Sequence, residues 1–126
     1  RPLPRIPDVL IRLLRSGDRC SQAQRAHELN AKYLDNRATV GSIRWVSNQN
    51  TRWGSTTLAT GDIRISDRLQ KVPDYVLDSV IIHELTHTFI PGHPKEFWNW
   101  ADRAPKAERA KGYLEAFARF GHIQED

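Results

Sequence analysis

Two histidines and a glutamate stand at the spacing of a metal-dependent hydrolase, in the run His83-Glu84-Leu85-Thr86-His87. In an α-helix His83 and His87 lie one turn apart on the same face, so both imidazoles can bind one metal ion. Glu84 lies on the flank of that face, where its carboxylate can accept a proton from a metal-activated water molecule without binding the ion. We therefore predict a catalytic metal site with His83 and His87 as ligands and Glu84 as the general base.

A third protein ligand would leave one position open for water on a tetrahedral zinc ion. Pro91 and Gly92 are expected to end the helix and turn the chain, which would bring His93 back toward the ion. We predict His93 as this ligand and one zinc ion per chain, because imidazoles with an open fourth position suit zinc; iron, cobalt or nickel could also bind there. An acid from a later helix could take the place of His93, and the acids available are Glu96, Asp102 and Glu108.

Length and composition indicate an ordinary globular domain. The chain has 126 residues, of which 39% are hydrophobic and 27% are charged. This is enough for one modest core, so we expect a single domain over residues 1–126. No apolar run is long enough to span a membrane, and we expect no membrane contact. The single cysteine, Cys20, cannot form an internal disulfide, which favours the cytoplasm.

The net charge of +4 is concentrated near the start of the chain. Residues 1–25 contain six arginines against two aspartates, whereas residues 26–126 contain equal numbers of basic and acidic side chains. We expect residues 1–20 to form a basic arm or a short helix. Such a segment can bind nucleic acid, but a solvated helix face is the simpler interpretation, and no nucleic-acid-binding motif accompanies it.

Changes in hydrophobic period predict the elements that carry the site. A helix is expected from Ser21, where Gln24 completes a capping box, to about Leu34. From residue 41 apolar and polar residues alternate, as in strands, and the short connections imply antiparallel pairing. Three strands are expected, near residues 43–45, 52–57 and 63–65.

We expect the remaining chain to be helical. A brief helix capped by Ser66 or Asp67 precedes the HExxH helix, which begins at Pro73-Asp74 and is flanked by apolar residues on several sides. Two further helices are expected to face inward through Phe97, Trp98, Ala101, Tyr113, Leu114, Phe117 and Phe120. The predicted fold class is α+β, with a small antiparallel sheet of about three strands packed on helices and the HExxH helix at the centre.

Three ordered motifs resemble one known family. Arg52–Ser55, Val80–His87 and His93–Trp98 are similar to the YgjP-like metallopeptidase domain, a relative of the SprT-like and WLM-type zincins. The resemblance covers about residues 48–98 and hardly includes the first forty. The family often carries cysteine directly after the Trp-Gly-Ser run, where this chain has Thr56.

This resemblance implies a zincin-like fold in which His83, His87 and His93 bind zinc and Glu84 is the catalytic base. It also suggests that a peptide or protein substrate lies beside the strand 52–57, through main-chain hydrogen bonds. We therefore expect a zinc-dependent metallopeptidase. Two alternatives stay open: a metal-dependent nucleotide phosphohydrolase, with the N-terminal arginines on the phosphates, and a basic nucleic-acid-associated module with a structural zinc.

Overall fold

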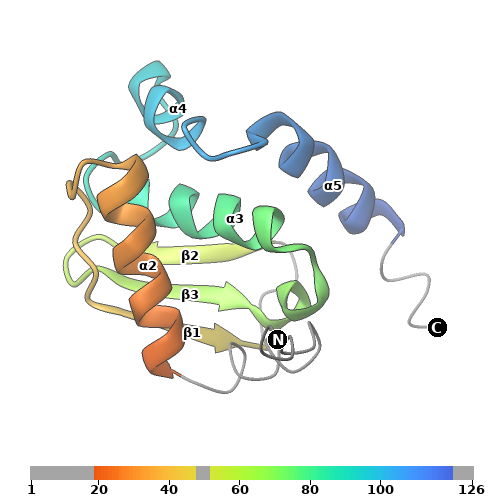
Figure 1. The fold of residues 1–126 in the computed structure, drawn as a ribbon, viewed down its shortest axis with the longest axis horizontal. Coiled ribbons are helices and arrows are strands. Elements are labelled where there is room, and N and C mark those ends of the chain that lie inside the picture. Colours follow the sequence, from red (N-terminus) through yellow and green to blue (C-terminus); the bar gives the residue numbers. More distant parts are fainter. Residues whose placement is uncertain (1–18, 48–51, 121–126) are drawn as a thin grey trace, which may run out of the picture.

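The computed structural model describes residues 19–47 and 52–120 and belongs to the predicted α+β class (Figure 1). Residues 1–18, which hold nearly all of the predicted basic arm, lie outside the described part. The elements in chain order are α2 (Arg19–Tyr33), β1 (Ser42–Val46), β2 (Gly54–Thr57), β3 (Asp62–Ser66), the 3-10 helix η1 (Asp67–Lys71), α3 (Asp74–His87), α4 (Lys95–Ala101) and α5 (Ala107–Phe120).

The sheet is mixed, and the prediction of an all-antiparallel sheet is wrong. Its strand order is β1-β3-β2. β2 and β3 form an antiparallel hairpin, whereas β1 runs parallel to β3 with Ile43 opposite Ile63. β3 takes the central position because Ile63 and Ile65 are almost completely buried, and a central strand is the place where they can contact both neighbours and the helices. β2 is consequently an edge strand of the sheet formed by the described residues.

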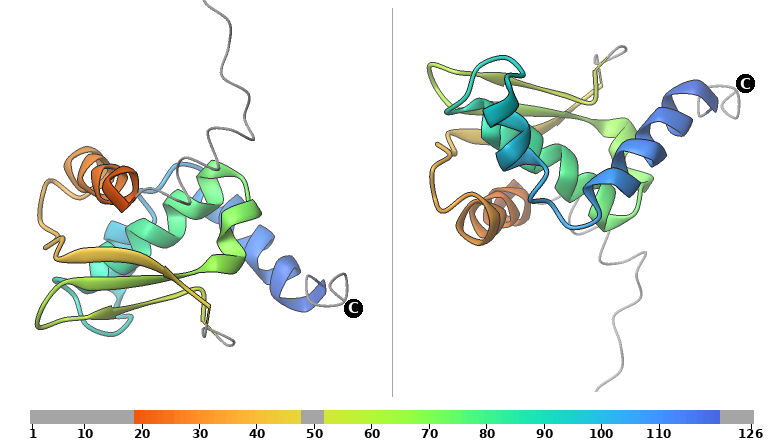
Figure 2. Two further views of the ribbon diagram at one scale, coloured as in Figure 1. Left: turned by 90° about the horizontal axis from the view of Figure 1, so that it is seen from below. Right: turned by 90° about the horizontal axis from the view of Figure 1, so that it is seen from above.

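One face of the sheet carries α2 and α3, as the two views of Figure 2 show. The core between these layers is apolar and includes Ile63, Leu69, Val76, Ile82 and Leu85, all less than 2% exposed. An ion pair ties the two helices together, because the guanidinium of Arg25 contacts the carboxylate of Asp78, with Nε 3.0 Å from Oδ1. α3 is therefore covered by α2 on one side and by the sheet on another.

α3 contains His83, Glu84 and His87 and contacts α2, α4, α5, β2 and β3. The helix ends at His87, earlier than the predicted end at Pro91 and Gly92. Thr88 is the reason: its hydroxyl donates a hydrogen bond of 2.6 Å to the carbonyl of Leu85, and its backbone N–H donates to the same oxygen. These bonds satisfy a carbonyl of the last turn and let the chain leave the helix before the proline.

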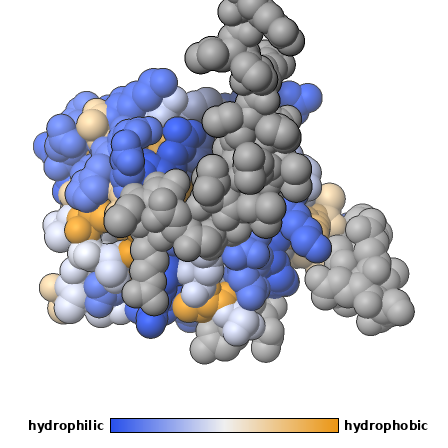
Figure 3. All heavy atoms as spheres, turned by 60° about the horizontal axis from the view of Figure 1, so that its bottom comes forward, coloured by the Kyte–Doolittle hydropathy of each residue, from blue (hydrophilic) through white to orange (hydrophobic). Residues whose placement is uncertain are grey.

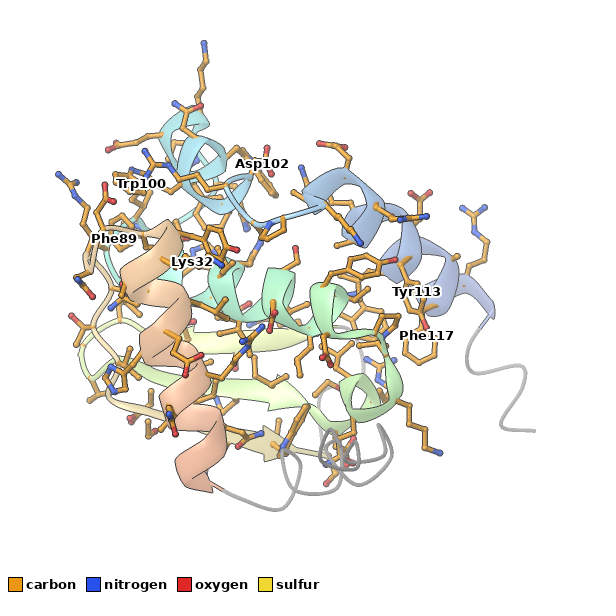
Figure 4. All side chains as sticks on the ribbon, viewed as in Figure 1. Lys32, Phe89, Trp100, Asp102, Tyr113 and Phe117 are labelled. Carbon is orange, nitrogen blue, oxygen red and sulfur yellow. The ribbon has the colours of Figure 1, made fainter. Side chains whose placement is uncertain are left out.

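α5 is less buried than its sequence predicts. Tyr113, Leu114 and Phe117 are only half-buried, although all three pack against the main core. Tyr113 and Phe117 lie on the side of α5 that faces the rest of the protein (Figure 4). The ring of Phe117 stacks on Trp53, with 5.5 Å between centroids. α5 extends beyond the end of α3, so part of its apolar side has no helix to pack against (Figure 1).

The face of the molecule shown in Figure 3 is largely polar where its residues are described. In the space-filling view of Figure 3, hydrophobic residues form small separate areas among hydrophilic ones. Leu58, at the turn between β2 and β3, is the large hydrophobic residue that the described chain exposes most, at 52%. Within residues 19–47 and 52–120, no helix is both long enough and apolar enough to cross a bilayer.

Candidate metal centre

The structure brings His83, His87 and His93 together. The first two project from one face of α3, and His93 comes from the loop between α3 and α4. Gly92 turns this loop with a φ of +70°, a conformation that costs a glycine little and other residues considerably more. One ring nitrogen from each histidine lies within 4.8 Å of the other two.

One pair of these nitrogens has the separation that a tetrahedral metal ion requires. Two ligands with Zn–N bonds of 2.0–2.1 Å and a tetrahedral angle would lie about 3.3–3.4 Å apart. Nε2 of His83 and Nε2 of His93 are 3.4 Å apart. Within the described residues, the group of potential ligands contains these three histidines and none of the alternative acids.

Two of the three alternative acids are occupied elsewhere. Lys111 Nζ lies 2.8 Å from a carboxylate oxygen of Asp102 and 3.1 Å from one of Glu108. Glu96 is exposed on the first turn of α4. None of the three joins the histidine group, so the geometry favours His93 over an acid as the third ligand.

Burial favours the neutral, metal-binding form of the two histidines on α3. Burial, together with smaller contributions from the neighbouring His87 and His93, lowers the pKa of His83 from 6.5 to about 4. Burial also lowers the pKa of His87, against a smaller opposite effect of the Ile90 carbonyl. A metal ion would therefore displace few protons from His83 and His87 at neutral pH.

Contacts with neighbouring groups orient the rings. Nδ1 of His87 lies 3.2 Å from the carbonyl oxygen of Ile90, and since a carbonyl can only accept, Nδ1 carries the proton and Nε2 is left as the ligand atom. Phe97, fully buried in α4, lies beside all three imidazoles, with ring centroids 4.4–5.0 Å away. Trp98 stacks on His93 at 5.6 Å. The sequence predicted Phe97 as an inward-facing residue, but not its position beside the histidines.

Glu84 is a buried carboxylate next to the histidines. Its residue is 6% exposed, and burial raises the pKa of its carboxyl group. The hydroxyl of Thr56 lies 2.7 Å from Glu84 Oε1 and 3.0 Å from the Glu84 carbonyl oxygen. The hydroxyl has one proton and so donates to one of these oxygens at a time. Thr56 was noted in the sequence only as a departure from the family pattern, and its contact with Glu84 is a new finding.

Gly54 allows β2 to approach Glu84. A Cβ atom at position 54 would lie 2.9 Å from the carbonyl oxygen of Arg64 and 3.1 Å from Cγ of Glu84. The groups that come closest to position 54 are therefore the side chain of Glu84 and the neighbouring strand β3. Gly54 and Thr56 lie on the same face of β2, two residues apart, so one strand both makes room for the carboxylate and holds it.

The histidines and Glu84 open into a cleft of about 920 Å³. One wall is the edge strand β2, and another is formed by Ser79, Val80, His83 and His87 of α3. The charged residues that line the cleft besides Glu84 are Arg52, Lys111, Asp102 and Glu115. Ligands reaching the metal centre would therefore pass along β2.

Comparison with known proteins gives one result. No curated protein and no solved structure matches the chain. The sequence profile of the YgjP-like metallopeptidase domain matches residues 18–117, which include every residue of the site described above. The chain therefore belongs to the YgjP-like metallopeptidase domain family.

Proposed function

We propose that the protein is a zinc-dependent metallopeptidase with a zincin-like fold. In this proposal His83, His87 and His93 hold one zinc ion per chain and Glu84 is the general base. The family supports a hydrolase of this class and a divalent metal. The observation that carries the proposal is the buried carboxylate of Glu84 beside three clustered imidazoles, at the base of an open cleft.

A divalent cation held by imidazoles would make water more acidic and polarise a carbonyl group. The residues of the chain supply the rest. The Thr56 hydroxyl holds Glu84 Oε1, which leaves Oε2 to accept a proton from the attacking water. Glu84 then gives this proton to the leaving amine. The raised pKa of the buried carboxyl suits both steps, because the group must take up and release a proton near neutral pH.

The cleft supports an extended peptide as the substrate. β2 lies at the edge of the sheet and lines the cleft with Gly54, Ser55 and Thr56. A peptide beside this strand would have its main chain aligned with the sheet and its scissile carbonyl near the histidines. Recognition through the main chain places few demands on the substrate sequence.

Hydrolysis of a nucleotide is less well supported. A triphosphate requires several cationic groups, and the cleft is lined by two permanently basic side chains, Arg52 and Lys111. Lys111 already pairs with Asp102 and Glu108. The N-terminal arginines proposed for this role lie mostly outside the described residues. A purely structural zinc is also disfavoured, because structural sites are closed by four protein ligands, whereas the ligand group within the described residues has three members and opens into a cleft.

The test compares purified protein loaded with zinc against the Glu84→Gln variant, on a denatured protein and on nucleoside triphosphates in parallel. Metal analysis should find about one zinc per chain, and peptide cleavage should fall about 10²- to 10⁴-fold in the variant while zinc content is kept. Glu96→Gln is the matched control, because Glu96 is exposed outside the cleft lining and should keep both zinc and activity. Hydrolysis of triphosphates without peptide cleavage would reject the peptidase.

A further inference from the structure

The part of the cleft next to α5 contains apolar as well as charged side chains. Val80 comes from α3, and Leu114 and Ala118 come from α5. Val80 precedes His83 by three residues and therefore lies on the same side of α3, one turn from the histidine group. Leu114 and Ala118 are four residues apart and share one face of α5. These three residues are called the apolar subsite below.

Neighbouring contacts fix the position of this wall. The ring of Phe117 lies parallel to that of Trp53, with an interplanar angle of 4° and 5.5 Å between centroids. Ala110 of the same helix is completely buried. These contacts anchor α5 against the body of the protein along one line of its surface. Leu114 is half-buried, packs against the core and also lines the cleft, whereas Ala118 is exposed where it lines the cleft.

Among the described residues, the charged side chains that line the cleft besides Glu84 balance one another. Arg52 and Lys111 are basic and Asp102 and Glu115 are acidic, and all four line the cleft. Lys111 Nζ lies 2.8 Å from Asp102 Oδ1 and 4.9 Å from the centre of the Trp98 ring. A charged side chain placed here would gain no net attraction and would lose water, whereas an apolar side chain would bury surface against Val80 and Leu114.

We propose that the apolar subsite binds a large uncharged side chain, such as leucine or phenylalanine, of the peptide whose main chain lies beside β2. This proposal rests on the proposed function, which supplies the peptide substrate. It adds a preference for the type of side chain on that peptide. The subsite is continuous with the metal centre, so this side chain belongs to a residue near the bond that is cut. One extra or missing methylene group in an apolar pocket changes the discrimination between substrates by about 10- to 200-fold.

Binding provides a test that does not depend on turnover. Zinc-loaded Glu84→Gln protein is titrated with labelled peptides of glycine and serine that differ at one central position, which is leucine, phenylalanine, alanine or aspartate. Fluorescence anisotropy should show leucine and phenylalanine peptides binding about tenfold or more tightly than the alanine peptide, and the aspartate peptide binding most weakly. Because the peptides are otherwise uniform, they can slide until the apolar residue reaches the subsite.

A pair of variants on α5 locates the effect. Ala118→Trp fills the apolar subsite and should remove the preference for leucine. Ala116→Trp is the matched control, because Ala116 is exposed on the same helix and does not line the cleft, so the preference should be kept. With the active protein, mass spectrometry of products from a peptide library should show a large apolar residue enriched at one fixed distance from the cut.

The outcomes separate the subsite from the peptidase. Equal binding of leucine and alanine peptides, or equal behaviour of the two tryptophan variants, would overturn the apolar subsite even if peptides are cut. A leucine preference that Ala118→Trp abolishes, with no cleavage by the active protein, would support the subsite and reject the peptidase.

Discussion

The hydroxyl oxygen of Thr56 lies 2.7 Å from Oε1 of Glu84, although the two residues are 28 positions apart in the sequence. A carboxylate that accepts such a bond is fixed in orientation as well as stabilised. Thr56 therefore connects the edge strand β2 to the predicted base on α3. The YgjP-like family often carries cysteine at this position. A thiol is similar in size to a hydroxyl but is a weaker hydrogen-bond donor.

Replacing Thr56 should impair turnover more than binding. We expect Thr56→Val, which keeps the shape and removes the donor, to lower kcat about 10- to 100-fold, because a hydrogen bond to a charged group is worth about 1.5–3 kcal/mol. Thr56→Ser should restore most of the activity. Steady-state kinetics on one peptide substrate measures both. If the serine variant is as impaired as the valine variant, Thr56 does not act through its hydroxyl.

Gly54→Ala should damage the site through crowding. The new Cβ would lie 2.9 Å from the Arg64 carbonyl oxygen and 3.1 Å from Glu84 Cγ, so either the strand or the carboxylate must move. We expect a loss of about 1–3 kcal/mol in the free energy of unfolding, measured with urea, together with reduced turnover.

Gly112→Ala is the matched control for this change. A Cβ at Gly112 meets nothing within 4 Å, and the residue lies inside α5, where alanine is favoured over glycine by about 0.5–1 kcal/mol. This variant should be slightly more stable and fully active. Unchanged stability and turnover of Gly54→Ala would contradict the close approach of β2 to Glu84.

His93→Ala should weaken zinc binding without unfolding the protein, because His93 is exposed and lies in a loop. Loss of a partner that only orients a ligand costs 10- to 100-fold in metal affinity, so loss of the ligand itself should cost at least about 100-fold. Competition with a chromophoric chelator measures the affinity. His27→Ala, which removes an exposed histidine of α2, should bind zinc as the parent protein does. Unaltered affinity in His93→Ala would point to an acid as the third ligand.

The metal-free protein should lose stability in mild acid. The pKa of His83 in the folded protein is about 4, below its ordinary value of 6.5, so the unfolded chain binds more protons as the pH falls from about 6.5 toward 4. His83 therefore favours the folded state fully above that range and progressively less within it. The groups around it include His87, His93, Lys111 and Asp102.

Urea unfolding of chelator-treated protein at several pH values between 4 and 7 measures this effect. Glu84 acts in the opposite direction, because its raised pKa lets the folded state take up a proton more readily. The comparison is therefore made with His83→Gln, whose stability should decline less between pH 6.5 and 4. Parallel curves for the two proteins would show that His83 is not buried as a neutral imidazole.

The sequence by itself determined the local features of the site. The four-residue interval between His83 and His87 specifies one face of a helix, and the proline and glycine before His93 specify a turn, because both depend on neighbours in the chain. Apolar alternation located the three strands. The concentration of arginines near the start of the chain was likewise visible without any knowledge of their contacts. The three motifs and their order along the chain likewise indicated the family without any knowledge of the fold.

Only the tertiary structure decided how these elements meet. The strand order depended on placing Ile63 and Ile65 in a strand between two neighbours, where both are buried. Apolar alternation does not show the direction of pairing, because it is the same for parallel and antiparallel strands. The contact of Thr56 with Glu84 and the position of Phe97 beside the histidines join segments that no periodicity relates. Hydrophobic pattern reports which side of an element is buried, but the partner it is buried against is selected by packing of the whole chain.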